Sequence, residues 1–230
     1  MDYALEVKNL SKTYKRSGFT LDNVSFRVPK GTIMGFVGEN GAGKSTTIGC
    51  ILNILFRDKG EIYVLGKEMR DQDTKLRQRI GVVYDGDNFP GYYTAEQAGE
   101  VMRRIYRKWD DEYFEKYLDR FGLDKKQKIK TYSRGMTMKL AIGAALSHKP
   151  ELLILDEATS GLDPVMREEM LEVFLEPSCN RSGGCAFRRH MSDYGRSFCS
   201  QYFPVSSCAG PGGSGSGLSQ KRERFQMEQI

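Results

Sequence analysis

The sequence predicts an α/β fold, because short apolar segments typical of buried strands alternate with longer amphipathic segments typical of helices. The strand-like segments are residues 3–8, 21–28, 32–37, 61–65, 80–84 and 152–155. A glycine-rich segment, residues 38–46, follows one of these strands and leads into a predicted helix over residues 45–55. Strand, glycine-rich loop and helix in this order form a defined supersecondary unit, which indicates a parallel sheet at the centre of the fold.

The remaining elements follow from the pattern along the chain. The first two strand-like segments alternate apolar with polar residues and end at a turn, Pro29-Lys30-Gly31, so we expect an antiparallel β part at the N-terminus. A polar stretch before residue 80 is expected to carry a helix. From Thr94 to about Leu146, long charged amphipathic segments with breaks at Gly122 and at 125–130 predict a helical subdomain inserted between strands.

The predicted domain organisation has three parts. Residues 1–86 and 148–176 form the core, and residues 87–147 form the helical subdomain. Residues 177–230 form an atypical tail rich in Gly, Ser and Cys.

Composition and charge exclude several classes of protein. The net charge is +5, but residues 1–176 hold 28 Lys and Arg against 27 Asp and Glu, so we expect no nucleic-acid partner. No apolar run approaches the length of a membrane span, and the start lacks a signal-peptide pattern, so we expect a cytoplasmic protein. Cys50 stands alone in the first part and no C-x-x-C pair occurs, which makes a zinc site or a redox pair unexpected.

Residues 38–45 fit the pattern G-x-x-x-x-G-K-[ST], a loop that cradles nucleotide phosphates. Its glycines let backbone N–H groups turn toward a polyphosphate at a helix N-terminus. Lys44 would reach the β- and γ-phosphates of ATP, and Ser45 would hold Mg²⁺. The predicted nucleotide-binding residues are Gly38, Glu39, Asn40, Gly41, Ala42, Gly43, Lys44, Ser45 and Thr46. The alternative is a glycine-rich turn before a core helix.

Two acidic residues follow the buried strand at 152–155. Asp156 would bind Mg²⁺ through water, and Glu157 would act as general base on the attacking water. A solvated strand end is the alternative. Together with the phosphate loop, the pair predicts a Mg²⁺-dependent ATPase. The predicted fold is thus a P-loop NTPase core with an N-terminal antiparallel β part and an inserted helical subdomain.

With these motifs, residues 1–176 resemble the nucleotide-binding subunits of ABC transporters, nearest to small bacterial exporter ATPases. Ser160-Gly-Leu-Asp163 matches the D-loop of that family, and Tyr132-Ser-Arg-Gly-Met136 stands in the place of its L-S-G-G-Q signature. The resemblance implies an ATP-hydrolysing subunit, peripheral on the inner face of the cell membrane, that powers a separate membrane permease. It also implies a head-to-tail dimer, in which Ser133 and the Gly135 backbone act on the ATP of the partner.

The resemblance suggests three further roles, each with an alternative. Tyr14 stands where the family places an aromatic residue that stacks on adenine, or it is a core or surface tyrosine. Asp85 stands where the family commonly has a glutamine that senses Mg²⁺; with Asp87 and Asn88 it can equally form a polar turn. His190 stands about where the family has a switch histidine that contacts the γ-phosphate, or it lies in a loose tail.

The tail departs from the family pattern. Its 54 residues contain 18 Gly or Ser and only three Val, Leu or Ile, too few for buried strands, and residues 209–217 resemble a flexible linker. Its composition resembles an out-of-frame reading or an engineered substitution. We therefore hypothesise that the native family sequence ends near Glu176. The strand before Asp156 would then lose a neighbour, which gives the alternative of an ATP-binding module with impaired hydrolysis. A soluble ABC ATPase that acts on ribosomes or DNA is the other alternative.

Overall fold

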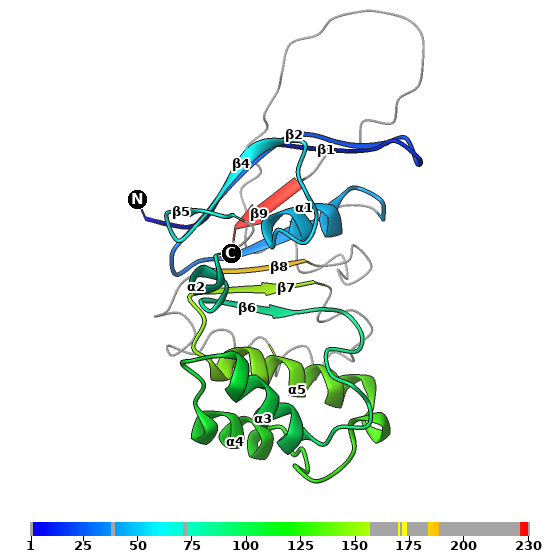
Figure 1. Ribbon diagram of the computed structural model, residues 1–230, viewed down its shortest axis with the longest axis vertical. Coiled ribbons are helices and arrows are strands. Elements are labelled where there is room, and N and C mark those ends of the chain that lie inside the picture. Colours follow the sequence, from blue (N-terminus) through cyan, green and yellow to red (C-terminus); the bar gives the residue numbers. More distant parts are fainter. Residues whose placement is uncertain are drawn as a thin grey trace, which may run out of the picture.

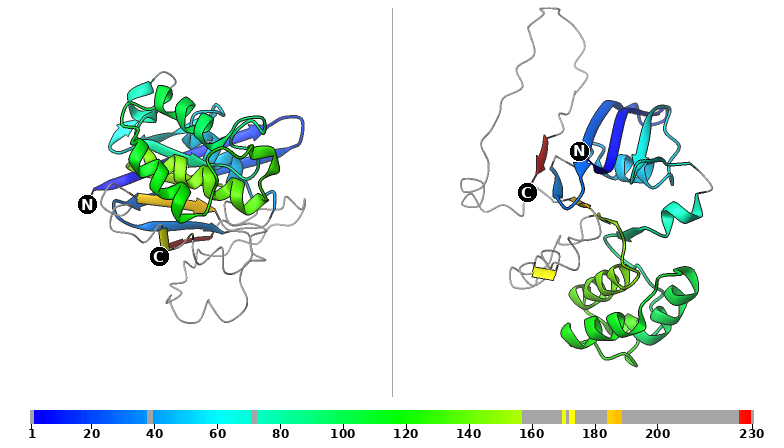
Figure 2. Two further views of the ribbon diagram at one scale, coloured as in Figure 1. Left: turned by 90° about the horizontal axis from the view of Figure 1, so that it is seen from below. Right: turned by 90° about the vertical axis from the view of Figure 1, so that its left-hand side faces the viewer.

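The computed structural model has two β-sheets and a group of helices, arranged in layers (Figure 1). It describes residues 2–37, 40–70, 73–156, 170, 172–173, 184–188 and 226–229. The antiparallel sheet and the helices α3 to α5 lie at opposite ends of the molecule, with the second sheet between them (Figure 2). This arrangement confirms the predicted α/β fold.

The N-terminal sheet is antiparallel and has the strand order β2-β1-β4-β5. Its strands are β1 (Tyr3–Tyr14), β2 (Phe19–Pro29), β4 (Lys59–Val64) and β5 (Lys67–Glu68). Residues 5–8 of β1 alternate as the sequence predicts: Leu5 and Val7 are buried in an apolar cluster, while Glu6 and Lys8 point away from it and form an ion pair. A register shift after Val7 lets Leu10 join the same cluster. The predicted antiparallel opening is therefore confirmed.

The second sheet has the strand order β6-β7-β8-β3-β9. Its strands are β6 (Ile80–Val83), β7 (Leu152–Leu155), β8 (Gly184–Arg188), β3 (Ile33–Val37) and β9 (Gln226–Gln229). The first four are parallel, and β9 is antiparallel to β3. The carboxyl ends of β7 and β3 therefore lie at the same edge, where ligands bind in open parallel sheets. Asp156 and the glycine-rich loop both start from this edge.

The position of β8 corrects the expectation about the tail. Leu152 of β7 pairs with Gly184, and Ile33 of β3 pairs with Cys185, so β8 lies between these two strands. The prediction that β7 would lose this neighbour is wrong. Backbone N–H and C=O groups carry strand pairing, so a segment poor in Val, Leu and Ile can still complete a ladder.

Helices α1 (Lys44–Ile51) and α2 (Thr74–Arg77) flank the second sheet. Ile48 and Ile51 of α1 belong to one apolar cluster with Leu152 and Ile154 of β7. The predicted helix over residues 45–55 ends at Ile51, four residues early. Asn53 adopts a left-handed φ of 54°, and the N–H groups of residues 54 and 55 return to the Gly49 carbonyl, which closes the helix end.

The other face of the sheet is covered by α3 (Ala95–Ile105), α4 (Asp111–Arg120) and α5 (Arg134–Ser147), with a short 3₁₀ helix at Ile129–Thr131. Leu153 and Leu155 of β7 pack into the apolar cluster that these helices form. The helical segment is interrupted after α4, at Gly122, whose φ is 63°. The predicted helical segment at 94–146 is thus confirmed, and the sheet has an apolar layer on each face.

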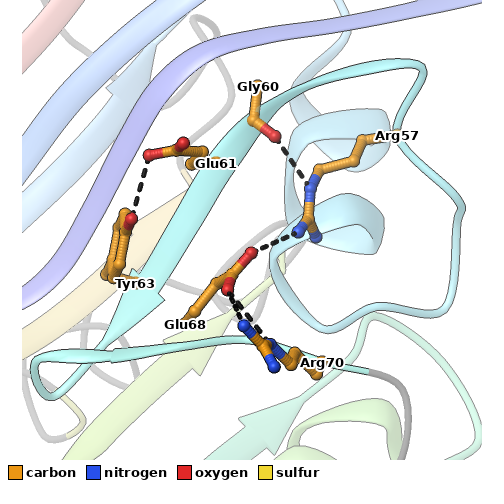
Figure 3. A network of polar contacts seen from close by, with 6 residues as sticks. All are labelled: Arg57, Gly60, Glu61, Tyr63, Glu68 and Arg70. Carbon is orange, nitrogen blue, oxygen red and sulfur yellow. Dashed lines mark hydrogen bonds and ion pairs between the residues drawn. The ribbon is translucent and has the colours of Figure 1, made fainter.

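Polar contacts fix the loop that leaves α1 (Figure 3). The Arg57 side chain donates a hydrogen bond of 3.0 Å to the Gly60 carbonyl and lies 3.7 Å from the Glu68 carboxylate of β5. Arg70 contacts the same carboxylate at 2.7 Å. These contacts hold the α1–β4 loop against the antiparallel sheet.

In the part of the chain that the structure describes, none of the helices is both long enough and apolar enough to cross a membrane.

Candidate functional site

A cavity of about 260 Å³ lies at the N-terminus of α1. Two parts of the chain form its walls: the end of the β1–β2 hairpin and the glycine-rich loop that enters α1. The lining residues are Tyr14, Ser17, Phe19, Gly41, Gly43, Lys44, Ser45 and Thr46. The structure therefore brings Tyr14 together with most of the predicted phosphate-loop residues.

The glycine-rich loop reaches α1 through left-handed backbone. Gly41 has a φ of 90° and Gly43 a φ of 95°, a region that side chains other than glycine rarely tolerate. Gly43 is the N-cap of α1, and its carbonyl accepts hydrogen bonds from the Thr47 N–H and hydroxyl at 2.8 and 2.9 Å. The motif glycines thus start the helix at the wall of the cavity.

The N-terminus of α1 differs from those of the other described α-helices. Side chains of Asp73, Thr94, Asp110 and Ser133 accept hydrogen bonds from the first turns of α2, α3, α4 and α5. Within the described residues no side chain caps α1 in this way, and its first turn contains no acidic residue. A helix N-terminus is a site for anions, and this one opens into a cavity.

Lys44 begins α1 and is only 2% exposed, the largest of the fully buried side chains in the described part of the chain. A lysine at this position of the motif can bind phosphate groups as a point charge. Ser45 is exposed and Thr46 half-buried beside it. Asn40 and Ala42 belong to the same loop but do not line the cavity, and Gly38 and Glu39 lie outside the described residues.

An aromatic pair forms the part of the wall that comes from the hairpin. Tyr14 and Phe19 face each other across the hairpin, and their ring centres are 6.2 Å apart. The Lys12 ammonium lies 5.7 Å from the centre of the Tyr14 ring. The sequence analysis identified Tyr14 and missed Ser17 and Phe19. The turn at Gly18 was the available signal, because a tight hairpin brings residues on both sides of the turn together.

Asp156 lies where the predicted second motif requires it. Its N–H donates to the Val83 carbonyl at 2.9 Å, so it follows β7 directly and lies beside the end of β6. Burial, together with the nearby Asp156 carboxylate, raises the pKa of Tyr84 in the same region. Glu157, Ser160 to Asp163 and His190 lie outside the described residues.

The oxygen donors at this edge fit magnesium bound with a nucleotide. Among the described residues, His, Cys, Asp and Glu side chains form no group of three that could hold a metal ion. Mg²⁺ commonly takes only one or two protein ligands and completes its octahedron with phosphate oxygens and water. The Ser45 hydroxyl and the Asp156 carboxylate are donors of this kind.

Asp85 has a partner that the sequence analysis did not foresee. Its Oδ1 accepts from the Arg134 guanidinium at 2.6 Å. Asn88 closes the surrounding turn, because its side chain bonds both the N–H and the C=O of Tyr84. The polar turn that we considered as the alternative is present, and a metal role for Asp85 stays a prediction.

The signature segment lies at the start of α5, and none of its residues lines the cavity. The Ser133 hydroxyl caps the helix by accepting from the Met136 N–H at 3.2 Å. Ser133 is exposed, whereas Gly135 is buried. Within one chain, therefore, these residues are not brought to the phosphate loop.

Comparison with known proteins points to one family. The family model described as ABC transporter matches residues 21–160. The bacitracin transport ATP-binding protein BcrA of Enterococcus faecalis is 32% identical over 189 residues, which cover 81% of this chain and 61% of that protein. The linearmycin resistance ATP-binding protein LnrL of Bacillus subtilis is 38% identical over 173 residues, which cover 73% of this chain and 55% of that protein.

A solved structure agrees with these relatives. CbiO1 of Clostridium perfringens, part of the ABC transporter complex cbiONQ, superimposes with a TM-score of 0.67 at 28% identity and covers 83% of this chain and 79% of that one. The chain spans less than two thirds of the length of BcrA and of LnrL. Motifs, fold and comparisons agree that the chain belongs to the family of ABC transporter ATP-binding proteins.

Proposed function

We propose that this protein binds and hydrolyses Mg²⁺-ATP as the ATPase subunit of a membrane transporter. One observation supports ATP binding above all: the uncapped N-terminus of α1 and the buried Lys44 meet an aromatic wall in a single cavity. Anion-binding groups at one end and an aromatic ring at the other match a nucleotide triphosphate, whose phosphates and base differ in the same way.

The residues predicted from the motifs divide the binding of Mg²⁺-ATP among them. The backbone of the loop at 38–43 binds the phosphates, and the ammonium of Lys44 neutralises the β- and γ-phosphates. The Tyr14 ring stacks on the adenine. Ser45 and Asp156 would hold Mg²⁺, which neutralises charge on the phosphate oxygens when it is bound.

Hydrolysis needs two residues outside the described part of the chain. We assign to Glu157 the role of general base, because the chain places it directly after Asp156 at the carboxyl edge of the sheet. His190 is proposed to contact the γ-phosphate. It follows β8 by two residues, and β8 is parallel to β7 and β3, so the chain leaves β8 at the same edge.

The signature segment supports a dimer. Ser133 is exposed, and none of the residues at 132–136 lines the cavity of its own chain. In a head-to-tail dimer, Ser133 and the Gly135 backbone would instead contact the nucleotide bound to the second ATPase subunit.

The relatives support a transport role. BcrA is named for bacitracin transport and LnrL for linearmycin resistance, and this likeness favours an exporter. We propose a separate permease as the membrane partner, with the ATPase peripheral on the inner face of the membrane. The division into a core, a helical subdomain and an atypical tail remains part of this proposal.

The test combines Mg²⁺-dependent ATP hydrolysis with a nucleotide-induced thermal shift on the full chain. ATP at 100 times its Kd should stabilise the protein by about 2.7 kcal/mol. Lys44→Ala should abolish most of the shift, whereas Lys67→Ala, which removes an exposed lysine of β5, should leave it unchanged. Equal shifts in wild type and Lys44→Ala would contradict the assignment of the phosphate loop.

Glu157→Gln separates binding from hydrolysis. We expect the thermal shift to survive and turnover to fall by about 10²-fold or more, the usual size of a general-base effect. Wild-type turnover in this variant would remove Glu157 from the role. A thermal shift without turnover in the wild type would identify the chain as an ATP-binding module with impaired hydrolysis.

A further inference from the structure

The ion pair between Asp85 and Arg134 joins two segments that are 49 residues apart in sequence. Asp85 belongs to the loop after β6, and Arg134 is the first residue of α5. The contact therefore links the edge of the sheet, where the second motif lies, to the signature segment at Tyr132 to Met136.

Hydrogen bonds of one side chain close the loop that carries Asp85. The Asn88 side chain donates to the carbonyls of Tyr84 and Gly86 and accepts from the Tyr84 N–H, at 2.9 to 3.0 Å. Strand β6 ends two residues before Asp85, at Val83, whose carbonyl accepts a hydrogen bond from the Asp156 N–H. The Asp85 carboxylate is thus anchored to the strand end that carries Asp156.

The segment that carries Arg134 is also ordered by local contacts. Ser133 caps α5 through its hydroxyl, and its carbonyl accepts from the N–H and hydroxyl of Thr137 at 2.9 and 3.2 Å. Arg134 directly follows this cap, so the ion pair of its guanidinium restrains the first turn of α5. The pair connects two ordered segments and not two loose side chains.

Charge and exposure indicate what the pair can do. The Arg134 guanidinium bonds Oδ1 of Asp85 and offsets its negative charge, which weakens the attraction of this carboxylate for a metal ion. The side chains of Arg134 and Asp85 are 52% and 37% exposed, and ion pairs at such positions stabilise weakly. The contact is therefore suited to orient the signature segment and to exchange when the nucleotide site changes.

This inference rests on the proposed function. We propose that Asp85 and Arg134 are positioning residues. They hold the signature segment in a fixed position relative to the carboxyl edge of the sheet, where the nucleotide would bind. Asp85 acts on Arg134 and is not a magnesium ligand.

The first experiment measures hydrogen exchange of the full chain without nucleotide. Asp85→Asn and Arg134→Gln should each speed exchange at Met136 and Thr137, the amides of the first turn of α5, by up to about fivefold, the factor that corresponds to an exposed ion pair. The reversed pair, Asp85→Arg with Arg134→Asp, should restore slow exchange. Arg103→Gln breaks a matched exposed ion pair, Arg103 with Asp111, and should leave the amides of α5 unchanged.

The second experiment separates positioning from metal binding. In steady-state ATP hydrolysis, each single variant should lower kcat with little change in the KM for ATP, and the reversed pair should recover kcat. The proposal is overturned if the single variants leave exchange at α5 unchanged. It is also overturned if Asp85→Asn alone raises the Mg²⁺ concentration needed for half-maximal rate and the reversed pair fails to rescue.

Failure of the proposed function would be recognised separately. A wild-type chain that gains no thermal stability from Mg²⁺-ATP would refute ATP binding. The exchange measurement needs no nucleotide, so it would still decide whether the pair positions the first turn of α5.

Discussion

Acid should destabilise this protein through His148, a histidine that is 1% exposed at the end of α5. Its ring stacks on Tyr106 with the ring centres 3.8 Å apart, and neither ring nitrogen has a hydrogen-bond partner among the described residues. Burial lowers the pKa of His148 to about 4, and the polar backbone groups of His148 itself and of Gln78 offset only part of this effect. The folded protein therefore holds this imidazole neutral.

The size and sign of the effect follow from the two pKa values. The unfolded chain protonates this histidine near pH 6.5 and the folded chain near pH 4. The contribution of the neutral ring to the free energy of unfolding is therefore fully present above pH 6.5, and it is lost as the pH falls toward 4. The difference corresponds to about 3 kcal/mol in full, most of which is lost between pH 7.5 and 4.5.

The assay compares wild type with His148→Phe by urea unfolding at pH 7.5 and 4.5. Phenylalanine retains the stacking on Tyr106 and cannot be protonated. Both proteins keep Asp110 and Glu151, whose pKa values are lowered by Lys149 and by Arg79, so acid weakens these ion pairs equally in both. Wild type should lose about 2–3 kcal/mol more than His148→Phe. Equal losses would refute the reasoning that buried, neutral His148 makes folding sensitive to acid.

Two further predictions test the aromatic wall and the helical packing. Tyr14→Ala should weaken ATP binding by about 1–3 kcal/mol but leave the affinity for inorganic triphosphate unchanged, because only the base loses its stacking partner; Tyr14→Phe is the control, and calorimetric titration measures both ligands. An equal loss for both ligands would argue against base stacking. Gly99→Ala would place a Cβ 2.6 Å from Cε1 of Phe114, so we expect α3 and α4 to move apart, and overpacking of this kind costs about 1–3 kcal/mol. Urea unfolding measures it, and an unchanged midpoint would show that the Phe114 ring can move aside.

The sequence allowed prediction of the features that depend on local patterning. Alternating apolar residues in β1 and β2, and the continuous apolar segment of β7, indicate strands because burial on one face or both requires those patterns. The phosphate loop could be placed because its glycines serve backbone geometry that the structure shows at Gly41 and Gly43. Even here the helix end at Ile51 was missed, since it depends on the left-handed turn at Asn53.

Features that depend on distant contacts could not be predicted. Asp85 and Arg134 meet only because α5 packs beside β6, which no local pattern reveals. In the sequence, His148 is an ordinary polar residue at a helix end. Its burial follows from the position of Tyr106, which comes directly after α3. The place of β8 escaped prediction because backbone pairing leaves no mark in side-chain composition.

The position of β8 has a consequence for the order in which the protein folds during synthesis. The residues that line the cavity all lie between positions 14 and 46 and leave the ribosome early. Strands β3 and β7 can both pair with β8 only after residues 184–188 have been synthesised. N-terminal segments fold first during synthesis, and pairings between distant segments form slowly. A nascent chain should therefore build the phosphate loop well before its sheet can close, and during that interval β3 and β7 expose unpaired backbone that a chaperone would need to shield.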